Sequence, residues 1–169
     1  MNKCIFLDRD GVLNRDKVDY VYKKEDHIIL PGVVEALHKF KNAGFKLVII
    51  TNQSGIAKGL YSATDVMICY DLLQDACGGI IDGIYYASYH PDYNSECLTR
   101  KPYSLMFEKA IAKFDIDAAQ SWMVGDKERD LVPARKLGIR TVHLKCDTQK
   151  YEADFTVLSL LEASAKILA

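Results

Sequence analysis

Apolar positions along this chain follow two alternating patterns. Short continuous apolar runs predict strands that are covered on both faces, and runs with apolar residues three or four apart predict amphipathic helices. We expect strands at residues 3–7, 45–51, 81–88, 121–126 and 140–144. We expect helices over residues 31–44, 63–77, around 107–114 and around 131–137, and a short strand followed by a last helix within residues 155–169. The alternation indicates βαβ units, and therefore an α/β fold with a central parallel sheet.

Length and composition are typical of one folded unit. The chain has 169 residues, of which 49% are hydrophobic, and this is enough to bury a sizeable core. It contains no internal repeat, no low-complexity tract and no stretch that resembles a linker. We therefore predict a single domain over residues 1–169.

Charge and cysteine usage narrow the class of protein. The formal net charge of -1 gives no reason to expect nucleic acid or an anionic membrane as a partner. The chain has neither a transmembrane-length apolar run nor the layout of a signal peptide. The cysteines are odd in number, scattered and never spaced as CxxC: Cys4, Cys69, Cys77, Cys97 and Cys146. We expect a reduced cytoplasmic protein, monomeric or weakly homo-oligomeric, without nucleic-acid or membrane partners.

Polar residues stand where several of the predicted strands end. Asp8 and Asp10 follow the first strand, Thr51 ends the second, and Asp126 ends the strand at residues 121–126. In open α/β sheets, ligands bind at the carboxyl ends of the strands. We therefore expect these residues from distant parts of the chain to meet at one edge of the sheet.

The three aspartates at this edge predict a magnesium site. Asp8, Asp10 and Asp126 would repel one another, by about 4 kcal/mol per pair at about 4 Å and an effective dielectric constant of about 20. Mg²⁺ removes that cost, and proteins bind it with a few carboxylates, waters and substrate phosphate. The alternative is a metal-free polar edge in which the aspartates cap helices. For "DRDG" alone, the two interpretations have similar weight.

Further residues favour phosphate as the substrate group. A phosphoryl group in transfer needs fixed donors and cations around its oxygens. Thr51 offers a hydroxyl, the "NQSG" that follows offers backbone N–H groups, and Lys101 of "TRKP" offers a cation. Each has a plainer alternative: Thr51 as a turn residue, Lys101 as a solvated lysine, and Asp130 of "GDKERD" as a helix-start carboxylate, which for Asp130 is the favoured one. The ordered combination of these signals, each after an apolar run, favours phosphoryl transfer.

The ordered set "DRDG", "TNQSG", "RKP" and "GDKERD" resembles the four motifs of the haloacid dehalogenase (HAD) superfamily of phosphohydrolases. Longer strings, "FLDRDGVLN", "VIITNQSGIAKG", "DGIYYASYHP" and "MVGDKERD", resemble its branch of bacterial histidinol phosphatases and heptose-bisphosphate phosphatases, over roughly residues 3–145. The resemblance implies a three-layer Rossmann-like fold and a hydrolase that acts on a small sugar phosphate. A large cap domain is not expected, because only 40 residues separate Asp10 from Thr51 and 49 separate Thr51 from Lys101.

The resemblance also implies roles for individual residues. Asp8 would be the nucleophile that forms an aspartyl-phosphate, and Asp10 would act as general acid and then general base. Mg²⁺ would be held by Asp8, by the backbone carbonyl of Asp10 and by Asp126. Thr51 and Lys101 would hold the transferring phosphoryl group. The positions at which relatives contact substrate or phosphate are Asn52, Gln53, Ser54, Arg100 and Lys127. We further predict that Asp10 holds a proton while Asp8 stays ionised.

A zinc loop found in this branch is degraded here. Relatives carry a Cys-x-His pair and a Cys-x-Cys pair, and these align with Ala87, Tyr89, Cys97 and Thr99. Only Cys97 is retained, and a nearby His90 does not complete the tetrahedral set that structural Zn²⁺ needs. We predict that no zinc binds and that catalysis is intact, while the substrate is left open.

Three alternatives to a sugar phosphatase remain. A histidinol-phosphate phosphatase of the same branch would use the same chemistry on another phosphomonoester. A phospho-accepting receiver domain would place its acceptor aspartate at the end of the third strand, where "IYYAS" has none. A binding protein on an inactive enzyme fold is disfavoured, because Asp8, Asp10, Thr51, Lys101 and Asp126 are all present.

Overall fold

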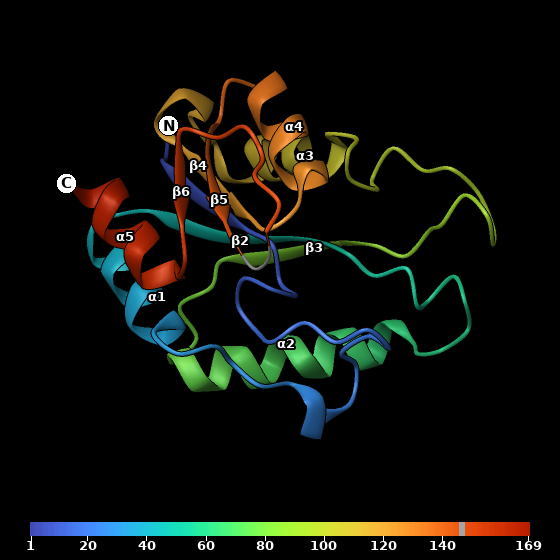
Figure 1. Cartoon of the computed structure of the whole chain (residues 1–169). Coiled ribbons are helices and arrows are strands. Elements are labelled where there is room, and N and C mark those ends of the chain that lie inside the picture. The colour runs from blue at the N-terminus through green and yellow to red at the C-terminus, as the bar shows by residue number, and fades with distance from the viewer. Residues whose placement is uncertain (146–147) are drawn as a thin grey trace.

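A parallel sheet organises the chain. The computed structural model describes residues 1–145 and 148–169, and within them six strands pair in the order β3-β2-β1-β4-β5-β6. The strands are β1 (Cys4–Leu7), β2 (Lys46–Asn52), β3 (Gly83–Ala87), β4 (Trp122–Gly125), β5 (Arg140–Leu144) and β6 (Phe155–Val157). All pairings are parallel, as the βαβ pattern predicted. The chain moves outward from β1 in both directions, so β1 and β4 flank the point where the strand order reverses (Figure 1).

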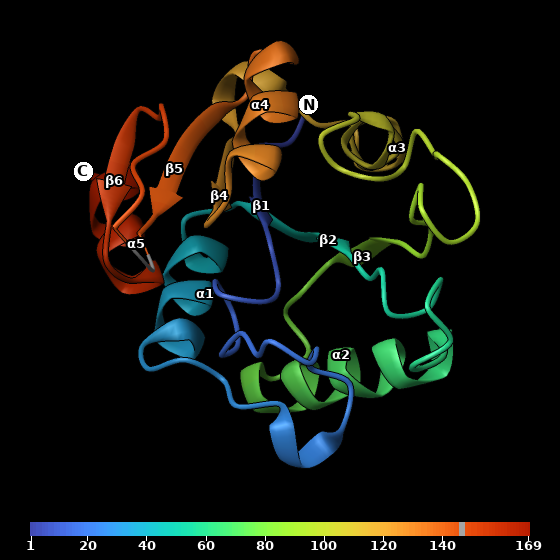
Figure 2. The ribbon, with the colours of Figure 1, turned by 45° about the vertical axis from the view of Figure 1, so that its right-hand side comes forward.

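Helices cover both faces of the sheet. They are α1 (Val33–Asn42), α2 (Ala63–Cys77), α3 (Leu105–Phe114), α4 (Glu128–Lys136) and α5 (Leu160–Leu168), with short 3-10 helices at Lys24–Asp26 and Ala118–Gln120. Figure 2 shows α3 and α4 on one side and α1 and α2 on the other. The result is the three-layer Rossmann-like arrangement expected from the sequence. None of these helices is long and apolar enough to cross a membrane.

Strand side chains alternate between two cores, because successive residues of a strand point to opposite faces. Ile5 and Leu7 of β1 pack with α1, α2 and α5, whereas Phe6 packs with α3 and α4. The ring centroids of Phe6 and Phe107 of α3 lie 5.2 Å apart. Both faces of β1 are therefore fully buried, which explains why the sequence of this strand is a continuous apolar run.

Helix boundaries follow local signals with one difference. Ser62 caps α2 as expected, since its side chain accepts from the N–H of Asp65 and the Asp65 carboxylate accepts from the N–H of Ser62. Helix α4 begins at Glu128, before the expected start near Leu131. The carboxylate of Asp130 accepts from the N–H of Lys127 at 3.0 Å, and this bond extends the helix toward the strand end.

Three loops lie beyond the carboxyl ends of the strands. We call residues 8–32 the β1 loop, residues 53–62 the β2 loop and residues 88–104 the β3 loop. Figure 1 shows the β2 and β3 loops projecting from the same end of the sheet. The described residues contain no separate cap domain, in agreement with the sequence. Of the cysteines, Cys146 lies outside the described residues; the others are free thiols.

Removing the aromatic contact under the sheet tests this packing. We expect Phe107→Ala to lower the free energy of unfolding by about 3–5 kcal/mol, because it opens a cavity beneath a fully buried ring. Urea unfolding with an unchanged m-value measures the change. Leu158→Ala is the control, since that side chain is 74% exposed and should change stability by no more than about 0.5 kcal/mol. Equal effects of the two variants would contradict the assigned core.

Candidate active site

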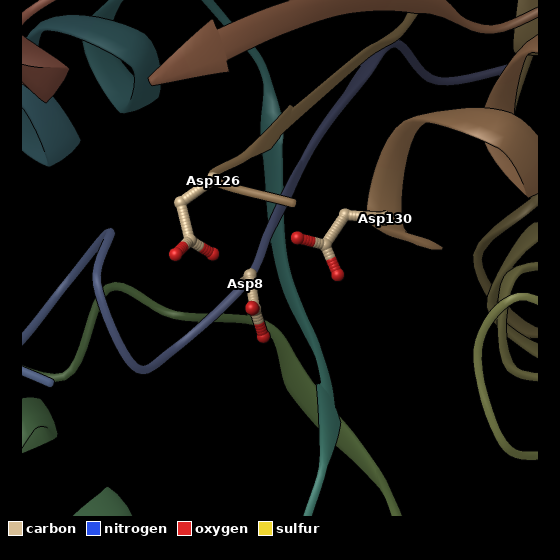
Figure 3. A group of neighbouring side chains, drawn as sticks. All are labelled: Asp8, Asp126 and Asp130. Carbon is tan, nitrogen blue, oxygen red and sulfur yellow. The ribbon is translucent and has the colours of Figure 1, made fainter. Parts of the chain in front are cut away.

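Three buried carboxylates meet where β1 and β4 end. Asp8 follows β1, Asp126 follows β4, and Asp130 lies in the first turn of α4. Figure 3 shows their side chains converging from these elements, and one oxygen of each lies within 4.8 Å of the others. Asp8 and Asp126 therefore share one site, as the sequence predicted. Asp130 was favoured as a plain helix-start carboxylate; it does cap α4, but it also belongs to this group.

Two glycines allow the carboxylates to come so close. Gly11 has a φ of +86°, and a Cβ at this position would lie 2.8 Å from Oδ2 of Asp126. At Gly125 a Cβ would lie 2.4 Å from the Cβ of Asp130. Glycine is therefore required at both positions, because Asp126 lies against Gly11 and Asp130 lies against Gly125.

Lys101 supplies the positive charge at the centre of the group. Its fully buried Nζ lies 2.9 Å from Oδ1 of Asp8 and 2.7 Å from Oδ1 of Asp130, and it donates to the carbonyl of Ile50 at 2.7 Å. Asn52 fixes the backbone of this lysine through two hydrogen bonds, one to its carbonyl at 3.0 Å and one from its N–H at 2.9 Å. The Lys101–Pro102 peptide bond is cis. The lysine is thus a buried ion-pair partner, and the solvated-lysine alternative is wrong.

The charges in this group are unbalanced. Burial, and then repulsion by Asp8 and Asp130, raises the pKa of Asp126 to about 7. Burial also raises the pKa of Asp130, while Lys101 opposes that shift. Burial disfavours the charge of Lys101, but its two carboxylate partners outweigh burial and raise its pKa. Three buried carboxylates face the buried ammonium of Lys101 and the half-buried ammonium of Lys127, 3.5 Å from Asp126. Negative charge is therefore in excess, and the donor set fits a hard dication such as Mg²⁺.

Asp10 lies beside this group and is held by other contacts. Arg9 donates to both of its oxygens, at 3.1 and 2.9 Å, and Asn14 and Gln53 donate to one oxygen each. Arg9 itself is buried and also donates to the carbonyl of Val21. These donors orient the Asp10 carboxylate at the wall of the cavity described next.

A cavity of about 340 Å³ opens over the carboxylates. Seven of the site residues that the sequence predicted line this cavity: Asp8, Asp10, Thr51, Asn52, Ser54, Arg100 and Asp126. The remaining lining residues are Asp16, Lys17, Val18, Tyr20, His90 and Arg129. No sequence motif marks the four from the β1 loop, because only the path of the chain brings them here. Arg129 had a signal within "GDKERD": it is a cation in the first turn of a helix, where the helix dipole disfavours positive charge.

Three predicted site residues do not line the cavity. Lys101 lies beneath it, and Lys127 lies beside it, with Nζ 3.5 Å from Oδ2 of Asp126. Gln53 is buried behind the wall, where its amide donates to Thr51 and Asp10 and accepts from the hydroxyl of Tyr61. In this structure Gln53 therefore positions catalytic candidates. Its expected substrate contact stays a prediction, as does that of Lys127.

The degraded zinc loop corresponds to part of the β3 loop. Sγ of Cys97 lies 3.0 Å from Oγ1 of Thr99, the residue that replaces a ligand cysteine. Hydrogen bonds from Thr99 lower the pKa of the Cys97 thiol. His90 contacts Asp92 and the ring of Tyr93. Absence of bound zinc stays a prediction.

Comparisons with known proteins agree on one family. A family model described as HAD-hydrolase-like matches residues 98–160. The chain is 42% identical to a D-glycero-beta-D-manno-heptose-1,7-bisphosphate 7-phosphatase of Haemophilus ducreyi, over 82% of this chain and 80% of that protein. It is 38% identical to the D-glycero-alpha-D-manno-heptose-1,7-bisphosphate 7-phosphatase of Burkholderia mallei, over 86% of this chain and 81% of that protein.

The structure is also similar to a solved one. The D,D-heptose 1,7-bisphosphate phosphatase of B. bronchiseptica, in complex with magnesium and phosphate, superposes with a TM-score of 0.88 and is 29% identical, with 98% of each chain covered.

The charge imbalance predicts how stability depends on pH without metal. In the unfolded chain Asp126 ionises near pH 3.8, whereas in the folded chain it holds its proton up to about pH 7. Its contribution to stability is therefore fully present below about pH 4 and is lost as pH rises to about 7. We expect Asp126→Asn to be more stable than wild type at pH 8, by at most about 4 kcal/mol, and by less at pH 5.

Urea unfolding in EDTA at both pH values measures this difference. Asp75→Asn, at an exposed carboxylate of α2, is the control and should differ from wild type equally at both pH values. The electrostatic assignment is wrong if Asp126→Asn behaves in the same way as this control.

Proposed function

The chain belongs to the HAD superfamily, in the family of the D-glycero-D-manno-heptose-1,7-bisphosphate 7-phosphatases, and from this premise we propose that it hydrolyses the 7-phosphate of a heptose 1,7-bisphosphate with Mg²⁺. One observation carries the proposal: a buried carboxylate paired with a buried lysine lies at the floor of a cavity whose wall holds further cations. This arrangement suits a substrate with two phosphates.

Asp8 is the proposed nucleophile. Its Oδ1 already accepts from the N–H of Arg9 at 2.8 Å and pairs with Lys101, so Oδ2 is the oxygen that attacks phosphorus. Attack forms the Asp8–phosphorus bond and breaks the bond between phosphorus and the sugar oxygen. Thr51, which lies at the end of β2 and lines the cavity, donates to a phosphoryl oxygen during transfer, and Lys101 beneath the cavity offsets the negative charge that Asp8 brings to the phosphate.

Asp10 is the proposed general acid and base. It gives its proton to the departing sugar oxygen, and then takes one from the water that attacks the aspartyl-phosphate. That second attack releases inorganic phosphate and restores Asp8. The hydrogen bonds from Arg9, Asn14 and Gln53 keep the Asp10 carboxyl at the cavity wall for both steps.

Asp8, Asp126 and Asp130 are the side chains that would hold Mg²⁺, with the backbone carbonyl of Asp10 as a further expected ligand. When bound, Mg²⁺ supplies positive charge that offsets the repulsion between the attacking carboxylate and the phosphate. Gly11 and Gly125 preserve the close approach of the carboxylates on which this depends.

Arg100 and Arg129 support a bisphosphate as substrate. Both line the cavity. Burial, and then repulsion by the nearby charge of Arg129, lowers the pKa of Arg100. Two neighbouring guanidinium groups repel each other unless an anion lies between or beside them. The phosphate that is not cleaved is such an anion, and arginine binds phosphate through paired hydrogen bonds.

Phosphate release from a panel of substrates tests the function. The panel contains both anomers of D-glycero-D-manno-heptose 1,7-bisphosphate, the heptose 7-phosphate and histidinol phosphate, each with Mg²⁺ and with EDTA. We expect the highest kcat/KM on a heptose bisphosphate, and no turnover in EDTA. Asp8→Asn should lower kcat by at least about a thousandfold, while the exposed control Asp75→Asn should not change it.

The outcomes separate two errors. Faster turnover of histidinol phosphate would replace the substrate but keep the chemistry. Phosphate release that needs neither Mg²⁺ nor Asp8 would overturn the mechanism.

Substitution of Arg129 tests recognition of the second phosphate. We expect Arg129→Gln to raise KM for the bisphosphate about tenfold, since one charged hydrogen-bond donor is lost, and to leave KM for the heptose 7-phosphate unchanged. Lys136→Gln removes a charge from the same helix outside the cavity lining and is the matched control. An equal change in KM for both substrates would rule out a role in reading the second phosphate.

A further inference from the structure

The β3 loop carries cavity residues although it has little core of its own. From residue 88 to residue 100 no residue is buried, and the loop has no helix or strand. Yet His90 and Arg100 of this loop line the cavity. Hydrogen bonds between His90 and residues 92–94 order the loop locally, but contacts from outside are needed to hold it against the cavity, because segments with few buried contacts open at low free-energy cost.

Contacts at the C-terminal base of the loop are clear. Arg100 donates to the hydroxyl of Ser54 at 2.5 Å and to the carbonyl of Tyr89 at 3.2 Å. Asn52 holds the backbone of Lys101. These contacts fix the base of the loop but do not reach its tip, where residues 91–96 are all exposed.

At the tip, a lysine of the β2 loop bridges to two tyrosines. Nζ of Lys58 lies 5.1 Å from the ring centroid of Tyr93, in the β3 loop, and 5.3 Å from that of Tyr20, in the β1 loop. Both distances are within the range of cation–π attraction. A hydrogen bond to Tyr20 also raises the pKa of the Lys58 ammonium above its ordinary value. One side chain therefore connects the three loops that surround the cavity.

Tyr20, one of the two tyrosines of the bridge, has an unfavourable backbone conformation. Its φ of +68° is in the left-handed region, which a bulky residue adopts only when its surroundings hold it there. Tyr20 lines the cavity, and its ring contacts Tyr61 edge-on at 6.0 Å between centroids. Tyr61 in turn donates to Gln53, which contacts Asp10 and Thr51. The bridge is thus connected through packed side chains to the proposed catalytic residues.

We propose that Lys58, held between Tyr20 and Tyr93, is a positioning residue that fixes the β3 loop over the cavity and so determines substrate affinity. The inference rests on the proposed function for its activity readout, but its structural readout is independent. Lys58 is not among the residues that line the cavity, so it acts through Tyr20 and Tyr93 and does not touch substrate. The Lys58 ammonium between two aromatic rings connects segments that are distant in sequence, as a bound metal ion does through its ligands.

Lys58→Met tests the bridge, because methionine keeps much of the apolar stem and removes the charge. We expect amide hydrogen exchange across residues 88–100 to become faster in the free protein. We expect KM for the heptose bisphosphate to rise roughly five- to tenfold, with kcat changed by less than about twofold. Lys58→Arg should restore both values, because a guanidinium also binds aromatic rings.

Tyr93→Leu provides a second route to the same result. Its side chain is 57% exposed, so the variant should fold normally and give the same increase in KM. The double variant Lys58→Met/Tyr93→Leu should raise KM no more than either single variant, because the contact between Lys58 and Tyr93 can be lost only once. Lys113→Met is the matched control, since Nζ of Lys113 lies 5.1 Å from the ring centroid of Phe114, and both residues belong to α3, outside the three loops.

The outcomes distinguish this inference from the proposed function. Unchanged hydrogen exchange in Lys58→Met overturns the bridge, whatever the enzyme acts on. Faster exchange with unchanged KM shows that the bridge does not set affinity and also overturns the proposal. A protein that hydrolyses no heptose phosphate would contradict the proposed function. The bridge would still be tested, because faster hydrogen exchange in Lys58→Met and its reversal in Lys58→Arg can be measured without activity.

Discussion

The site depends on one buried ammonium placed among carboxylates. Lys101 is fully buried, and burial of a lone charge is costly unless partners compensate. Asp8 and Asp130 provide that compensation at 2.9 and 2.7 Å, and the carbonyl of Ile50 takes a further hydrogen bond. The same ion pairs keep Asp8 oriented at the end of β1. The lysine thus has a structural role within the protein and an electrostatic role toward the proposed substrate.

The sheet supplies the positions for this arrangement. β1 and β4 are neighbours at the reversal of strand order, so Asp8 and Asp126 emerge side by side at their carboxyl ends. α4 starts directly after β4, and Gly125 lets Asp130 approach closely. An excess of negative charge follows from this packing. It is unfavourable for the metal-free protein and favourable for binding a dication.

Loops form much of the cavity wall above the buried carboxylates. The β1, β2 and β3 loops contribute polar and aromatic side chains, and few of them are buried. Arg100 is tied to Ser54, Gln53 to Asp10 and Thr51, and Lys58 to two tyrosines. Asp8, Thr51 and Asp126 thus stand at strand ends, while Arg100 and the residues that support it stand on loops that side-chain contacts hold in place.

The sequence by itself determined the sheet, its helices and the meeting of Asp8 with Asp126, because apolar periodicity and strand-end position are local properties. Its main site motifs also located Thr51, Asn52, Ser54 and Arg100 at the cavity. Only the tertiary structure decided that Asp130 joins the carboxylates, that Gln53 faces inward, and that Tyr20, Lys58 and Tyr93 meet. Those outcomes depend on close backbone approach at a glycine and on the paths of loops that share no periodicity, and neither is encoded in local spacing.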